Sequence, residues 1–535
     1  MKATRTFGKI RTAAITIGIV MSSTASAQTL QPPELTALEE LGKHAFFDTT
    51  LSKPKGQGCV SCHDPASGWT FPDSVVNDGP VVAPGAIWHR SGGIKTPGNS
   101  YISSAPVFQR CSEIFGGNRG APAGGRYCGG MFWDGRAEGY GKEGWAPKAD
   151  GALSDTVTPA DLPESVREAY TEYLGPLADQ ALNPFPNSVE QNIDPKHVCK
   201  RISRGDYAHL YKEVFGERIN CKTKPNSNPA YITSFKRIAV ALSAYQASPD
   251  VNSFTSKRDI ALYRELACLT DGNEGEFVEF WDADFCNQDK GAPWGEFPLL
   301  ELSAQENRGH DLFYGLETAS NEPEPVLDEG GNETGEFTTT NAGCHRCHND
   351  NPLADDGTEP FQTYNDHGYH GIGLPFNREI PGAVPGVIDG VISHVSYRAD
   401  NGEAVEPGFF KNPSVRNVAK GEGEITKAYG HNGYFKSLKG IVHFYSTRDL
   451  KRSCGADRIR SVRGVPTLIA QGLNLDIEHP TEEEALANNC WPLAEFQNSE
   501  GNFADIGILN LTDEQEDALV AYMMTLSDQY TPEAP

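Results

Sequence analysis

Two short stretches decide the fold: Cys59-Val60-Ser61-Cys62-His63 and Cys344-His345-Arg346-Cys347-His348. In each, two thiols three positions apart are followed directly by a histidine. This pattern can attach a c-type haem through two thioether bonds and place the histidine beneath the iron as proximal ligand. A disulfide, a zinc site and a thioredoxin-like motif are the alternative interpretations. Two copies in one chain favour two covalently bound haem c groups, held by Cys59, Cys62 and His63 and by Cys344, Cys347 and His348.

The first 27 residues have the order of a secretory signal peptide. Basic residues precede an apolar stretch from about Ala13 to Met21, and Ala25-Ser26-Ala27 offers a cleavage site. The stretch is shorter than the roughly 20 residues that span a bilayer. We therefore expect cleavage after Ala27, no membrane span, and a periplasmic or secreted protein.

Eight of the 12 cysteines lie outside the two motifs, and an even remainder in an exported chain predicts disulfides. Pairing between sequence neighbours predicts Cys111 with Cys128, Cys199 with Cys221, Cys268 with Cys286, and Cys454 with Cys490.

The formal net charge is −26. Such a charge argues against nucleic acid and anionic membranes as partners, and it favours a basic soluble partner through long-range steering. The alternative is that the charge serves solubility alone.

The chain is too long for one core and divides most simply into two haem domains in tandem. We predict a first domain over 28–260, a connector over 261–298 pinned by Cys268 and Cys286, and a second domain over 299–535. Helical spacing over Ile232–Tyr245 closes the first domain, and a helix capped by Thr512 with Gln515 closes the second. With 55 Gly, 36 Pro and no long alternating pattern, we expect a mainly α fold with long irregular loops, including a surface loop over Glu317–Gly335.

The sixth iron ligand separates an electron carrier from a catalyst. A carrier haem commonly takes Met, yet after the second motif the chain has only Met523 and Met524, both in the terminal helix. Tyr and His remain as candidates there, and a phenolate stabilises oxidised iron.

Several blocks, in order, resemble the bacterial di-haem cytochrome c peroxidase and MauG family. The resemblance covers nearly the whole mature chain and implies two cytochrome c-like domains, each mostly helical, with the haems facing across their interface. The blocks that carry it are Leu41–Asp48, Asp64–Ala66, Phe132–Ala137, His370–Pro375, Phe410–Val418 and His431–Gly433.

The resemblance also implies roles for single residues. Trp133 matches the tryptophan between the two haems, and Glu190 matches the acid/base carboxylate, with Gln180 as its neighbour in the distal segment of the first haem. Tyr445 falls where the family's peroxidases place a Met ligand and its MauG branch places a Tyr. The plainer interpretations are a core aromatic for Trp133, a solvated acid for Glu190 and an interface aromatic for Tyr445.

The chain also departs from the family in several places. Extra residues between Arg136 and Gln180 can reshape the channel to the first haem. The family's calcium between the haems uses an Asn side chain where this chain has Lys95, which counts against a calcium ion. Two residues before the second motif, the MauG branch has a Trp that carries holes to a protein substrate, and this chain has Ala342 at that position. His431 is interpreted as structural.

Together these features predict a peroxidase. Hydrogen peroxide would bind above the haem held by His63, Glu190 with Gln180 would move a proton between its oxygens, and Trp133 would connect the two haems. An external donor, such as a small cytochrome or cupredoxin, would return the electrons. Two rivals remain: a MauG-like oxidase of a protein or organic substrate, and a di-haem electron carrier without chemistry of its own.

Overall fold

A computed structural model describes residues 34–111, 127–140, 156–223, 229–267, 297–316, 325–327, 333–337, 342–349, 361–385, 408–462, 465–496 and 506–535. The described chain is mostly helical with a few short strands, as the sequence predicts. Its helices are α1 (Ala37–Phe47), α2 (Ser74–Asp78), α4 (Glu164–Tyr170), α5 (Pro176–Ala181), α6 (Pro195–Ile202), α7 (Ala208–Phe215), α8 (Ala230–Ala247), α9 (Lys257–Ala267), α11 (Ala304–Tyr314), α12 (Leu438–Thr447), α13 (Glu482–Ala487) and α14 (Asp513–Met524).

The described strands form two-stranded pairs. Four of these pairs, β1 with β2, β3 with β4, β5 with β6 and β8 with β9, are antiparallel, and β7 pairs with β10 in parallel. The bounds are β1 (Gln109–Arg110), β2 (Tyr127–Cys128), β3 (Pro325–Leu327), β4 (Glu333–Phe337), β5 (Tyr369–His370), β6 (Phe410–Lys411), β7 (Arg452–Ser453), β8 (Arg458–Val462), β9 (Val465–Ala470) and β10 (Cys490–Trp491).

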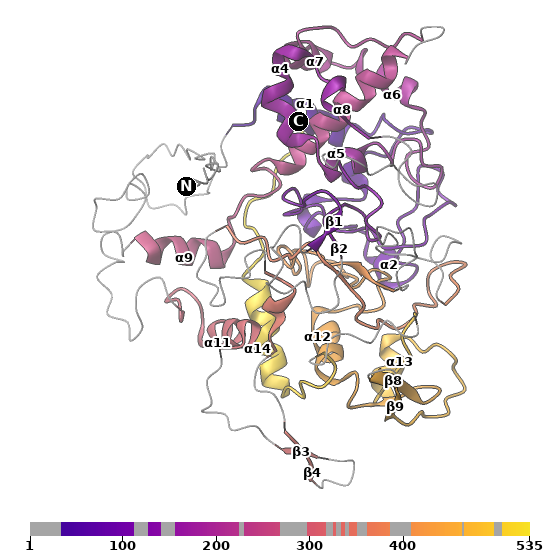
Figure 1. The fold of residues 1–535 in the computed structure, drawn as a ribbon, viewed down its shortest axis with the longest axis vertical. Coiled ribbons are helices and arrows are strands. Elements are labelled where there is room, and N and C mark those ends of the chain that lie inside the picture. The colour runs from indigo at the N-terminus through magenta and orange to yellow at the C-terminus, as the bar shows by residue number, and fades with distance from the viewer. Residues whose placement is uncertain are drawn as a thin grey trace, which may run out of the picture.

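The two halves of the chain occupy opposite ends of the molecule (Figure 1). The largest cluster of buried apolar side chains in the described part comes from residues 38–251, and a second comes from residues 312–526. The chain end returns to the first half, where Tyr530 donates a hydrogen bond to Asp250 at 2.9 Å. This tail ties the two halves together.

Each half is built on a pair of closely packed helices, and glycine permits the approach. A Cβ on Gly42 of α1 would lie 2.0 Å from the carbonyl oxygen of Ala241 in α8. A Cβ on Gly309 of α11 would lie 1.9 Å from the carbonyl oxygen of Ala518 in α14. In both pairs a helix that precedes a Cys-x-x-Cys-His motif packs against the helix that closes the same half.

The expected helices are present. Ile232–Tyr245 lies within α8, which ends at Ala247 ahead of Pro249. Helix α14 begins after Thr512, whose side chain accepts from the backbone of Gln515 in a capping box.

Three of the four predicted disulfides are confirmed: Cys111–Cys128, Cys199–Cys221 and Cys454–Cys490. The pair Cys268 and Cys286 lies outside the described residues, as do the predicted signal peptide and most of the connector. The expected surface loop over Glu317–Gly335 contains β3 and the start of β4, which pair as a hairpin although the segment is rich in Gly and Glu. No helix in the described ranges is long and apolar enough to cross a membrane.

Candidate haem sites

The first motif lies in a 3₁₀ turn over Cys59–Ser61, directly after the loop that follows α1. The thiols of Cys59 and Cys62 are free and half-buried. His63 Nδ1 lies 3.2 Å from the carbonyl oxygen of Trp69. Since a carbonyl can only accept, Nδ1 carries the proton and Nε2 keeps its lone pair. Burial lowers the pKa of His63 to about 4, so the imidazole is neutral at pH 7.

The second motif repeats this arrangement. Cys344 and Cys347 are free thiols, and His348 Nδ1 lies 3.1 Å from the carbonyl oxygen of Pro413. Burial lowers the pKa of His348 to about 4. His345 contacts the carbonyl oxygen of Phe313 at 3.2 Å, which holds the motif against α11. Both sites therefore present a neutral, oriented imidazole beside two free thiols, and this donor set fits a covalently attached haem.

Tyr445 projects from α12 into the cavity that Cys344, Cys347 and His348 also line. Burial raises the pKa of Tyr445, and the nearby cysteines add to the shift. The guanidinium of Arg448, one helical turn further on, acts in the opposite direction. The structure thus places Tyr445 in the cavity of the second motif, with the guanidinium of Arg448 close by.

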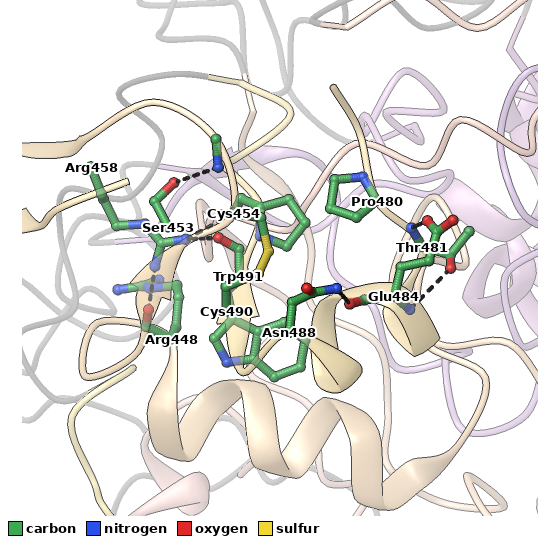
Figure 2. Close-up of a disulfide and its surroundings, with 12 residues drawn as sticks. Arg448, Ser453, Cys454, Arg458, Pro480, Thr481, Glu484, Asn488, Cys490 and Trp491 are labelled. Atoms are coloured by element: carbon green, nitrogen blue, oxygen red, sulfur yellow. Dashed lines mark hydrogen bonds between the residues drawn. A yellow bond between two sulfur atoms is a disulfide. The ribbon is translucent and has the colours of Figure 1, made fainter. Parts of the chain in front are cut away.

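The end of α12 is fixed by a buried arginine cluster beside the Cys454–Cys490 disulfide (Figure 2). Arg448 binds Asp449 and donates to the carbonyl oxygens of Ile372 and Ile506, each at 2.9 Å. Arg458 donates to the carbonyl oxygen of Arg448. These contacts hold the turn that follows Tyr445.

Trp133 is buried between the two halves. Its indole Nε1 donates to the carbonyl oxygen of Lys95 at 2.7 Å, and its own carbonyl accepts from the backbone of Lys411 at 2.9 Å. His431 meets the indole edge to face at 6.4 Å, stacks on Phe410 and binds Glu495 at 3.0 Å. His431 is thus engaged in packing and a buried hydrogen bond, in line with its structural interpretation.

The two predicted distal residues have different surroundings. Gln180 in α5 is buried and lines the same cavity as Trp133. Glu190 is half-buried in the turn after α5, where Asn187 donates to its Oε1 at 2.6 Å. The charge of Glu190 raises the pKa of the Cys62 thiol, after the larger effect of burial, so this carboxylate lies close to the first motif.

Sequence reasoning missed a buried pair beside the second motif. Asp366 contacts His370 Nε2 at 2.9 Å, and a carboxylate oxygen of Asp366 lies within 4.8 Å of the Cys347 sulfur. Asn412 donates to Asp366 at 3.1 Å and also to the carbonyl oxygen of Cys347. These three ligand types could hold a metal ion, but Cys347 belongs to the haem motif. Asp366 and His370 are only four residues apart, but their surroundings form when distant segments bring Asn412 and Cys347 beside them.

A known protein family and several known proteins are similar to this chain. Residues 36–265 match the family model described as di-haem cytochrome c peroxidase. Methylamine utilization protein MauG of Paracoccus denitrificans is 25% identical over 519 residues, which cover 96% of this chain and 95% of MauG. By these two matches the chain resembles the di-haem cytochrome c peroxidase and MauG family. Members of this family are oxidoreductases with haem cofactors.

Two further comparisons agree with the family. Cytochrome-c peroxidase IdrP2 of Denitromonas iodatirespirans is 22% identical, covering 81% of each chain. A variant of the diheme peroxidase BthA from Burkholderia thailandensis E264 has a TM-score of 0.51 at 21% identity, covering 92% of this chain and 86% of that one. The second comparison concerns the fold alone.

Calcium, which the family resemblance implies between the haems, does not fit the residues present. Lys95 Nζ donates to the carbonyl oxygen of Thr96 at 3.1 Å, and Lys427 Nζ donates to the carbonyl oxygens of Ser67 and Lys420 at 2.8 Å each. The charge of Lys95 also acts on Lys427. Calcium takes oxygen ligands, preferably carboxylates, and two ammonium groups repel it.

Proposed function

We propose that this chain is a di-haem c-type peroxidase that reduces hydrogen peroxide to water with electrons from an external donor. The observation that carries the proposal is the repeated donor set: two free thiols and a histidine whose Nδ1 is engaged by a carbonyl, found at both motifs. When bound, the haem irons supply the redox chemistry. The reaction balances as one peroxide, two electrons and two protons giving two waters.

Glu190 is the proposed acid/base group. Reduction of peroxide requires a proton to move from one oxygen to the other, so that water can leave. Glu190 lies near the first motif, and the Asn187 amide donates to its Oε1 at 2.6 Å, which helps to hold the carboxyl group in place. Gln180, on the cavity wall, would orient the peroxide through its amide.

Trp133 is the proposed connection between the two haems. Its indole is bonded to Lys95 from the first half, and its carbonyl is bonded to Lys411 from the second half. A buried aromatic ring fixed from both sides can pass electrons without moving. His63 and His348 would each hold one iron. Tyr445 would be the second protein ligand of the iron that His348 holds.

The chemistry also supports domain and location proposals. Each half has its own apolar cluster and its own motif, which supports two tandem cytochrome c-like domains over 28–260 and 299–535 with a connector between them. The disulfides support an oxidising compartment, the periplasm or the outside of the cell. The net charge supports a basic soluble donor, such as a small cytochrome or cupredoxin.

The test begins with haem stoichiometry on the purified protein. Haem stain after denaturing electrophoresis and a pyridine haemochrome assay should give two covalent haems per chain. Stopped-flow absorbance should then show a reaction with stoichiometric peroxide, followed by decay when a donor is added. One haem per chain would refute the di-haem proposal, and two haems that are inert to peroxide would favour the electron carrier.

A MauG-like oxidase of a protein or organic substrate is the second candidate. It is favoured by the relation to MauG over nearly the whole chain and by Tyr445 in place of a Met ligand. Changing Tyr445 to Met should raise the potential of the second haem, because a thioether favours ferrous iron. If the wild type reacts from its fully ferric state and the variant must first be reduced, Tyr445 is the ligand. An unchanged potential would exclude it.

A further inference from the structure

The cavity at the second haem motif has several cations in its wall. It has a volume of about 300 Å³, and five Lys or Arg residues contribute to its wall: Lys95, Arg346, Lys411, Arg416 and Lys427. Among the described residues that line it there is no Asp or Glu. The whole chain has 72 acidic and 46 basic residues, so this interior wall has the opposite balance.

One of these cations is already neutralised. Arg416 donates two hydrogen bonds to Asp259, and both side chains are fully buried. In contrast, three buried lysines have no carboxylate within hydrogen-bond distance in the described part of the chain. They are Lys95, Lys411 and Lys427.

Lys411 has the most unusual surroundings. Its side chain is 7% exposed, and its Nζ has no hydrogen-bond partner. The aromatic ring of Tyr369 lies 5.7 Å from Nζ. Burial lowers the pKa of Lys411 and of Lys427 to about 7 and that of Lys95 to about 8. The charge of Asp366 acts on Lys411 and that of Glu422 on Lys427, but neither carboxylate is bonded to its lysine. A buried ammonium without a bonded counter-ion is costly, so the site is suited to an anion.

The three lysines lie next to the haem motifs. Lys427 binds the carbonyl oxygen of Ser67, four residues after His63. Lys411 lies two residues before Pro413, whose carbonyl contacts His348. Both Lys95 and Lys411 are bonded to Trp133 through their backbones. An anion bound by these lysines would therefore lie between the two haems.

We propose that Lys95, Lys411 and Lys427 bind the propionate carboxylates of the two haem groups in this cavity. Each haem carries two such carboxylates, and an ammonium binds a carboxylate through a charge-assisted hydrogen bond. This proposal rests on the proposed haem attachment. It also gives the lysines a purpose at the position where the family's calcium does not fit.

The consequence is electrostatic. A positive charge beside a haem carboxylate disfavours the ferric iron, which carries one more charge than the ferrous iron. Removing one lysine should therefore lower the midpoint potential. We expect the ratio of reduced to oxidised haem at a fixed potential to fall at least tenfold, which is 59 mV for a one-electron couple.

The test uses Lys411→Met in the holoprotein, because Lys411 Nζ has no hydrogen-bond partner in the protein that the variant would lose. With a carboxylate present, the variant loses the partner of a buried charge and should melt at a lower temperature, with a lower midpoint in spectroelectrochemical titration. Without one, the variant removes an unpaired charge and should melt at a higher temperature. The change in melting temperature therefore has opposite signs in the two cases. Lys411→Arg keeps the charge. It should leave the ratio of reduced to oxidised haem at a fixed potential within threefold of the wild-type ratio.

Lys436→Met is the matched control. Lys436 also links the halves, donating to the carbonyl oxygen of Asn77 at 2.9 Å, but it has its own carboxylate partner, Glu379, at 3.1 Å. This variant should lose stability without moving either midpoint. A midpoint that depends on added acetate would identify a diffusible anion and overturn the proposal, as would an unchanged midpoint in Lys411→Met with two haems bound. A protein without two haems would refute the proposed function instead.

Discussion

Glu190→Gln tests the acid/base step with little change in structure. The backbone of Glu190 is fixed by two hydrogen bonds that the substitution does not touch: its carbonyl accepts from Ala86 at 2.8 Å, and its N–H donates to Asn187 at 3.2 Å. The Asn187 amide donates to Oε1 at 2.6 Å, and the Oε1 of Gln can accept the same bond. The variant therefore keeps the shape of the turn and loses the ionisable carboxyl group that could take up and release a proton.

A positioned acid/base group contributes about 10²–10⁴ in rate. At about 1.36 kcal/mol per tenfold, the barrier should rise by about 3–5 kcal/mol. The measurement is the second-order rate constant for peroxide by stopped-flow absorbance, with haem content and both ferric spectra checked first. Glu217→Gln is the control, because Glu217 is an exposed acid that pairs with Arg237, and this change should leave the constant unaffected.

The reasoning is refuted if Glu190→Gln, with both haems bound, reacts within threefold of the wild type. Glu190 would then be a solvated acid. Asn187→Ala separates position from proton transfer, since it keeps the carboxyl group and removes its support. Its rate should fall between those of the wild type and Glu190→Gln.

Three further variants test the fold. Gly309→Ala should lower the thermal midpoint, since its Cβ would meet a backbone oxygen of α14 at 1.9 Å; overpacking costs about 1–3 kcal/mol and outweighs the helix-propensity gain of up to about 1 kcal/mol. Asp259→Asn should cost about 3–5 kcal/mol in urea unfolding, because Arg416 loses its buried partner. Burial would raise the pKa of Asp259, but Arg416 holds it below its ordinary value. The stabilisation by the Asp259–Arg416 pair is therefore present above about pH 4 and is lost on acidification. Only the wild type should show this loss, because the variant has no carboxyl group at position 259. Changing both Cys454 and Cys490 to Ser should lower the free energy of unfolding by about 4 kcal/mol, because the disulfide restricts the unfolded chain. Differential scanning calorimetry measures the effect, and an unchanged melting temperature would refute this stabilisation by the disulfide.

The features that could be predicted from sequence are those made by neighbouring residues. A Cys-x-x-Cys-His motif places all its ligands within five positions, so its chemistry can be read without the fold. Thr512 and Gln515 likewise form a cap within one turn. The confirmed disulfides close loops between neighbouring cysteines, which chain entropy favours over distant pairings.

The features that could not be predicted depend on contacts between distant segments. Lys411 and Lys427 look like ordinary surface residues in the sequence, and Lys95 stands out only by comparison with the family. All three are buried in the folded chain. Asp366 and His370 come together with Asn412 through the pairing of β5 with β6. The hairpin of β3 and β4 was missed because acidic, glycine-rich sequence is more typical of loops than of strands.

The links between the halves bear directly on electron transfer. Transfer between two haems depends on their separation, so the halves must not move relative to each other. Trp133 is bonded to Lys95 and Lys411, and Asp528 in the returning chain end accepts hydrogen bonds from Tyr101 and Asn417. The Lys411–Trp133 and Tyr101–Asp528 bonds join the two halves, and Lys95, Trp133 and Lys411 also line the cavity at the second motif. The same residues that fix the orientation of the halves therefore also fix the path that the proposed reaction needs.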